Sequence, residues 1–66
     1  MNNDKVTRVL RCLHVAQAFT EKAHFIAINA EDDETRKRLS HLLRQYHSEI
    51  VRIAETYDAP FPGPKS

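Results

Sequence analysis

The sequence has very few of the residues on which several protein classes depend: its 66 residues include one cysteine, one glycine and no tryptophan. A disulfide needs two cysteines, so Cys12 cannot form one within the chain. A single thiol without a signal-peptide pattern is typical of a reducing, cytoplasmic setting. One glycine excludes a Gly-rich phosphate-binding loop, and no apolar run approaches the roughly 20 residues of a membrane span. We therefore expect a cytoplasmic protein that does not insert into membranes.

An excess of charge of one sign is also missing. Ten basic and nine acidic residues give a net charge of +1, whereas dedicated nucleic-acid-binding domains are usually clearly basic. An apolar content of 41% with 29% charged residues favours a compact helical protein over a disordered one. A chain this short buries only about 60% of its unfolded surface. Without disulfides, oligomerisation or a metal remains as the means of stabilising so small a core.

A regular apolar pattern predicts a first helix over about residues 4–29. Asn2, Asn3 and Asp4 offer N-cap side chains just before the apolar series begins. Seven apolar residues then recur at alternating spacings of three and four, a heptad pattern that covers about six helical turns. We call this set the seam; its members are Val9, Cys12, Ala16, Phe19, Ala23, Ile26 and Ala30. The seam is the side on which we expect this helix to be buried.

A second helix is predicted over about residues 33–58, after a bend at about 30–32. Asp32 or Asp33 can cap its start, because the acidic run there suits the positive end of the helix dipole. Pro60 pushes the residue before it out of helical geometry, so the helix should end near Asp58. The apolar stripe of this helix consists of Leu39, Leu43, Tyr46, Ile50, Ile53 and Tyr57, widened by Leu42 and Ala54.

The end of the chain differs in composition from the two helices. Residues 60–66 contain all three prolines and the single glycine, and such a segment is expected to be extended and flexible. Phe61 either frays with this tail or folds back over the end of the hairpin. The predicted domain organisation is therefore a helical hairpin over residues 1–59, followed by a Pro-rich flexible tail.

A bend this short makes the two helices lie antiparallel, so the predicted fold is an all-α, two-helix hairpin. A lone hairpin buries one side of each helix, yet the first helix is apolar on nearly all sides. Leu10, Phe25 and Ile28 fall close to the side opposite the seam at about 100° per residue. We therefore expect a homodimer that forms a four-helix bundle. In size and topology the chain resembles the Rop-type bundle, a dimer of helical hairpins that binds paired RNA, and the resemblance implies this architecture.

Glu21 and His24 form a Glu-x-x-His motif, which places two potential metal ligands on one side of a helix. The motif is similar to that of ferritin-like di-iron bundles, which combine two such motifs with further glutamates. This resemblance implies a divalent metal held by Glu21 and His24. Residues 39–42, which face the motif from the second helix, include no acid, so a second copy with a different offset would have to supply one. Apart from this metal, no cofactor is predicted.

The sequence shows no arrangement of catalytic side chains. Cys12 has no base near it to activate the thiol, so no enzymatic activity is expected. Apolar side chains on the first helix and a basic stripe on the outer side of the second could instead contact another protein, and the stripe could also contact RNA phosphates. The predicted partner-binding residues are Leu10, Phe25, Ile28, Arg44 and Arg52. We predict a small regulatory or inhibitory protein that binds another protein; the alternatives are metal binding and RNA binding.

Overall fold

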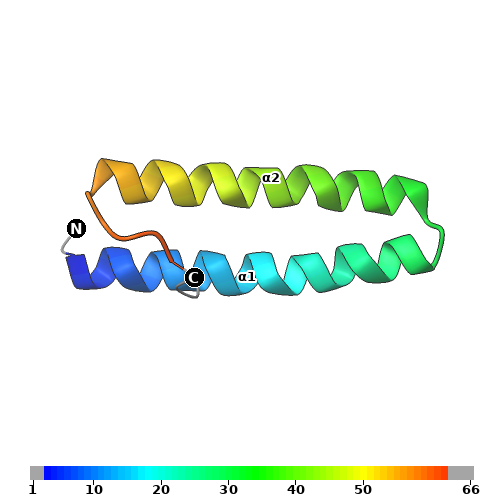
Figure 1. Cartoon of the computed structure of the whole chain (residues 1–66), viewed down its shortest axis with the longest axis horizontal. Helices are drawn as coiled ribbons and strands as arrows, with labels where there is room; N and C mark the ends of the chain where they lie inside the picture. The colour runs from blue at the N-terminus through cyan, green and yellow to red at the C-terminus, as the bar shows by residue number, and fades with distance from the viewer. Residues whose placement is uncertain (1–2, 63–66) are drawn as a thin grey trace.

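The structure is a hairpin of two long antiparallel α-helices. It is a computed structural model that describes residues 3–62 and the side chains of residues 4–62; the candidate N-cap Asn2 and tail residues 63–66 lie outside this range. Helix α1 spans Asn3–Asn29 and helix α2 spans Asp33–Thr56. The helices lie side by side in a body of 43 × 19 × 19 Å (Figure 1). The predicted all-α hairpin is confirmed.

Helix α1 ends at the bend, where two backbone hydrogen bonds close its last turn. Glu31 has a left-handed backbone conformation, with φ of 57°. Its N–H donates to the carbonyl of Ile28, and the N–H of Asp32 donates to the carbonyl of Ala27, both at 3.1 Å. This is the Schellman arrangement, which satisfies carbonyl groups that the end of a helix leaves free. The left-handed residue reverses the chain within a few residues, so α2 runs back along α1.

Asp32 begins α2 as its N-cap. Its carboxylate accepts hydrogen bonds from the Thr35 hydroxyl at 2.7 Å and from the Thr35 N–H at 3.1 Å. These hydrogen bonds, that of the hydroxyl foremost, hold the pKa of the Asp32 carboxyl below its ordinary value. One turn further on, Arg38 and Glu34 form an ion pair at 2.9 Å. The acidic run and the basic run after it therefore serve to start α2.

The hydrophobic core lies in the half of the hairpin that contains the start of α1 and the end of α2. Its buried and partly buried members are Val6, Leu10, Leu13, Ile50, Ile53, Ala54 and Ala59. The same heptad series of α1 continues with Gln17, Thr20 and His24, which are half-buried, and reaches the buried Ala27 near the bend. The middle of the α1–α2 contact is therefore more polar than its outer end.

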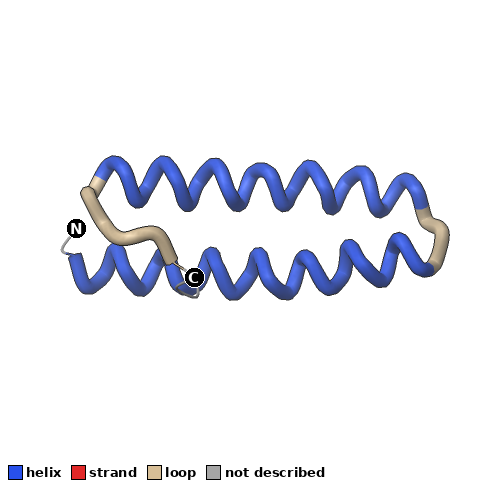
Figure 2. Tube along the Cα trace, in the orientation of Figure 1, coloured by secondary structure: helices blue, strands red, loops and turns tan. Residues whose placement is uncertain are grey.

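The described part of the tail folds back along the hairpin, as the loop after α2 shows in Figure 2. Asp58 takes up a second left-handed conformation, with φ of 49°, and ends α2 as Glu31 ends α1. Ala59 then packs against the core, and the ring of Phe61 lies 6.0 Å from the ring of His47. Of the two possibilities left open by the sequence for Phe61, the structure has the folded-back one.

Leu10 tests the position of this core. We expect Leu10→Ala to lower the free energy of unfolding by about 2–5 kcal/mol, because it opens a cavity at a fully buried position of the core. Urea unfolding followed by far-UV circular dichroism measures the change. As a control, Phe25→Ala removes a larger but exposed side chain and should change the value by no more than about 0.5 kcal/mol. A larger loss for Phe25→Ala than for Leu10→Ala would contradict this assignment of the core.

Candidate functional site

The seam of α1 is exposed in the single hairpin. Phe19 and Ile26 are 65% and 67% exposed, and Cys12, Ala23 and Ala30 are exposed as well. The prediction that the seam is the buried side of this helix is therefore wrong for one chain by itself. An apolar series that follows α1 over almost its whole length lies instead in contact with solvent.

The side of α1 that does contact α2 starts with Val6, Leu10 and Leu13. These are branched aliphatic side chains close together in the sequence, and they meet Ile50 in the core. Over these first turns the seam has only Val9 and Cys12, which offer less apolar area to α2 than three aliphatic side chains do. At this end of the hairpin, packing therefore favours the side of Val6, Leu10 and Leu13 over the seam.

The seam and the α2-facing side of α1 point in directions about 100° apart. On α2, the flank that turns to the same side of the hairpin as the seam carries Leu39, Leu42, Tyr46 and Ile53, which are partly exposed. We call this flank and the seam together the apolar face. In a four-helix bundle each helix has two nearest neighbours in roughly perpendicular directions, and α1 has two apolar sides arranged in that way.

The described part of the tail lies on the opposite side of the hairpin. Phe61 and Pro62 border a shallow hollow together with His14 and Glu21 of α1 and His47 of α2. His14 and Glu21 stand about half a turn from the seam around α1. Phe61 and Pro62 therefore do not cover the apolar face.

The three apolar residues predicted to bind a partner do not lie together. Leu10 is 1% exposed and belongs to the hairpin core, so its predicted position on the outer side of α1 is wrong. The reason is that its heptad series, and not the seam, meets α2. Phe25 and Ile28 are 63% and 44% exposed, one helical turn apart near the bend. Phe25 also borders a hollow with Ala18, Glu21, Lys22 and Ile26.

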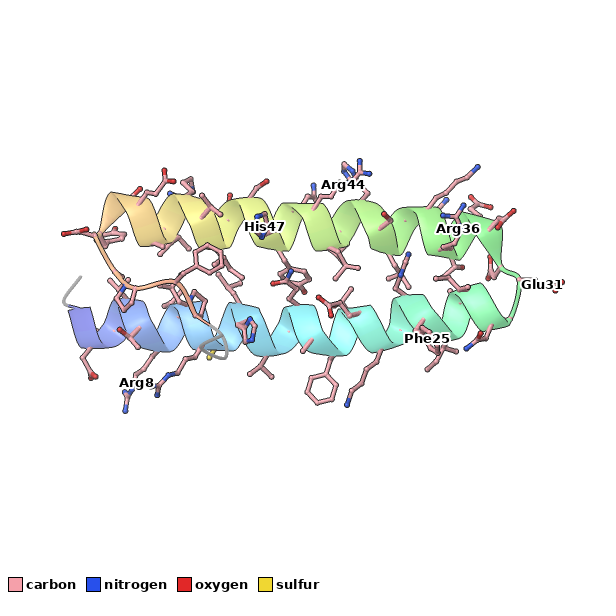
Figure 3. All side chains as sticks on the ribbon, viewed as in Figure 1. Arg8, Phe25, Glu31, Arg36, Arg44 and His47 are labelled. Atoms are coloured by element: carbon pink, nitrogen blue, oxygen red, sulfur yellow. The ribbon has the colours of Figure 1, made fainter. Side chains whose placement is uncertain are left out.

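The two basic residues predicted to bind a partner lie on α2. Arg44 is exposed and points away from α1 (Figure 3), and it lines two shallow hollows that both include His41. Arg52 donates two hydrogen bonds to one carboxylate oxygen of Glu49, from Nε at 3.1 Å and from Nη2 at 2.9 Å. The hydrogen bonds to Glu49 raise the pKa of Arg52. Arg44 is thus the more available of the two for an anionic partner.

Glu21 and His24, the predicted metal ligands, differ in how far they are buried. Glu21 is exposed, whereas His24 is half-buried beside α2 and its Nε2 atom is buried without a hydrogen-bond partner. Within residues 3–62, no three His, Cys, Asp or Glu side chains come close enough to hold a metal ion. Within the described hairpin, Glu21 and His24 therefore have no third protein ligand. Metal binding by these two residues stays a prediction.

Compared with models of known protein families, with curated proteins and with solved structures, this chain matches none. Over the part of the chain that the structure describes, neither helix combines the length and the hydrophobicity needed to cross a membrane.

The buried Nε2 atom of His24 leads to a test of the metal hypothesis. A buried polar atom without a partner costs about 1–3 kcal/mol, so His24→Leu should raise the free energy of unfolding by about that amount, measured by urea unfolding without metal. Glu21→Ala, at the exposed position of the same motif, should leave it unchanged within about 0.5 kcal/mol. If added Zn²⁺ or Fe²⁺ stabilised the wild-type protein and neither variant, Glu21 and His24 would instead be metal ligands.

Proposed function

We propose that this chain is a small, non-enzymatic binding protein that dimerises into a four-helix bundle and acts on another protein as a regulator or inhibitor. The observation that supports the proposal is the apolar face, on which Phe19 and Ile26 are about two-thirds exposed. Monomeric soluble proteins rarely leave so continuous an apolar surface in water. Both apolar sides of α1 would be buried in such a bundle.

Energetic considerations favour a dimer over a lone hairpin. Five apolar residues are buried in the described chain, and two of them are alanines. Fully burying one Phe or Ile side chain contributes about 1.5–3 kcal/mol. Covering the seam in each of two copies would therefore add as much apolar burial as the hairpin core itself contains. Burial in the dimer would also shield the Cys12 thiol, which suits the reducing, cytoplasmic setting that we propose.

The surface for the other protein would be the patch of Phe25 and Ile28. These residues point away from the seam around α1, so dimerisation through the apolar face would leave them outside. Glu21 and Lys22 flank Phe25, which gives the patch an apolar centre with a charged rim. Interfaces between proteins commonly have this composition, and a helix or loop with apolar anchors would fit it.

RNA binding is a second candidate function, supported by the outer side of α2. Lys37, His41 and Arg44 are exposed there at helical spacing, and among the described residues none of the three is in an ion pair. Dimerisation would double this positive surface. Because contacts to phosphates release counterions, RNA binding would weaken steeply with salt, whereas binding through Phe25 and Ile28 would depend on salt only weakly.

Two double variants with equal added charge distinguish the proposed surfaces. We expect Phe25→Glu with Ile28→Glu to abolish retention of partner proteins from lysate of the source cells on the immobilised protein, while the dimer mass is unchanged. The control, Gln45→Glu with Ser48→Glu, adds the same charge to the outer side of α2 and should retain the partners. Quantitative mass spectrometry of the bound proteins measures both.

The opposite pattern would contradict the assignment. If the control variant lost the bound material and the Phe25 and Ile28 variant kept it, the contact would lie on α2. Partner proteins retained equally by both variants would exclude both surfaces.

A further inference from the structure

We propose that the second copy packs its apolar face on the first with the two bends at opposite ends, so that α1 lies antiparallel to α1 of the other copy and Arg8 faces Glu31 across the interface. This inference rests on the proposed dimer and adds its orientation. The occupant of the apolar face is thus a second copy of this chain, and the following observations support that choice.

Two symmetric arrangements bury the apolar face. In one, the two-fold axis runs parallel to the helices, both bends lie at the same end, and each α1 packs against α2 of the second copy. In the other, the axis crosses the helices, the bends lie at opposite ends, and each α1 packs against the other α1. Charge and side-chain size favour the second arrangement.

The charges of α1 differ between its two ends. The beginning carries Lys5, Arg8 and Arg11, whereas the bend carries acids at the four successive positions 31–34. Asp33 and Glu34 are paired with Arg36 and Arg38 within the hairpin. With bends at the same end, the repulsion between like charges would therefore come mainly from Glu31 and Asp32 of the two copies. With bends at opposite ends, the basic start of one α1 lies beside the acidic bend of the other. The second arrangement is therefore the electrostatically complementary one.

Arg8 and Glu31 are the pair best placed to benefit. With the two-fold axis near Phe19, residues come level when their numbers sum to about 39, so Arg8 comes level with the partner bend at Glu31. Figure 3 shows Arg8 pointing away from α2 and Glu31 at the tip of the bend. Neither side chain is in an ion pair within the described hairpin.

Side-chain sizes along the seam also suit α1 against α1. Ala16 and Ala23 lie on either side of Phe19. At this register Phe19 comes level with Phe19 of the second copy, and Ala16 comes level with Ala23 of the second copy. The two rings then meet at the two-fold axis, and the alanines on either side leave room for them and let the helices approach closely.

The size of the apolar face fits a stable dimer. One whole side of the hairpin, 43 Å long and 19 Å wide, has on the order of 800 Å², which is what each partner contributes to an interface of standard size. The face therefore requires no larger partner than a second hairpin.

Distances between spin labels test the orientation. In a Cys12→Ala background, we would attach a nitroxide to Arg8→Cys or, in a separate protein, to Lys22→Cys, and measure label separations by pulsed electron–electron resonance. With bends at opposite ends, the labels at position 8 lie roughly 35 Å apart, since about 23 residues of helix separate them along the axis. Position 22 lies near the middle, so its labels should be separated by less than about 20 Å.

Other outcomes separate the two proposals. Short distances at both positions would overturn the orientation and keep the dimer. The mass of one chain, with no dipolar signal at either position, would overturn the dimer of the proposed function. Equilibrium sedimentation of the labelled proteins reports that mass independently.

A charge exchange tests the ion pair itself. Arg8→Glu alone should weaken the dimer by about 3–30-fold in its dissociation constant, because each of two symmetric contacts becomes repulsive. Adding Glu31→Arg to the same chain exchanges the charges and should restore the constant to within about two-fold of wild type. If the second substitution weakened the dimer further, Arg8 would not face Glu31.

Discussion

The structure depends on one constraint: a helix in a two-helix hairpin has a single neighbour, whereas α1 has apolar side chains on two sides about 100° apart. Helix α2 covers the side of Val6, Leu10 and Leu13. The side of Phe19 and Ile26 is left in water. The core stays small because many of the large apolar residues of α1 lie outside it. The proposed dimer follows from this mismatch between the number of apolar sides and the number of neighbours.

Local chemistry at the bend fixes the geometry on which this depends. The left-handed Glu31 ends α1, and Asp32, bonded to Thr35, starts α2 directly afterwards. So tight a connection holds the helices antiparallel over their whole length. It also concentrates acidic side chains at one end of the molecule, far from the basic start of α1. The same residues that shape the hairpin thus give it the charge asymmetry on which the proposed orientation of the dimer rests.

The elements of the fold could be predicted from the sequence, but the contact between them could not. Heptad spacing, the acidic cap and Pro60 place the helices near their observed bounds, because these signals are local. Which side of α1 meets α2 depends on how well two surfaces pack. Two heptad series run along α1, and the more continuous one, the seam, is the one that α2 does not cover. For this reason Leu10 was expected on the outer side although it is buried.

For the site residues, exposure could be predicted from the sequence in most cases, but side-chain contacts could not. Phe25, Ile28 and Arg44 are exposed as their positions on the helices indicate, since exposure on the side away from a neighbour follows from helical geometry. The pairing of Arg52 with Glu49 and the buried Nε2 of His24 depend on rotamers and on α2, which the spacing of the sequence does not contain. A second heptad series beside the first was the signal in the sequence that α1 has two apolar sides.

The proposed dimer requires the apolar face to bind a second copy. Sedimentation equilibrium of the wild-type protein and of Phe19→Glu measures whether it does. We expect twice the chain mass of 7.6 kDa for the wild type, and a single chain with reduced helicity for the variant, because a charge in the middle of the seam cannot be buried there. A wild-type protein that is fully helical and sediments as one chain at every concentration would contradict it.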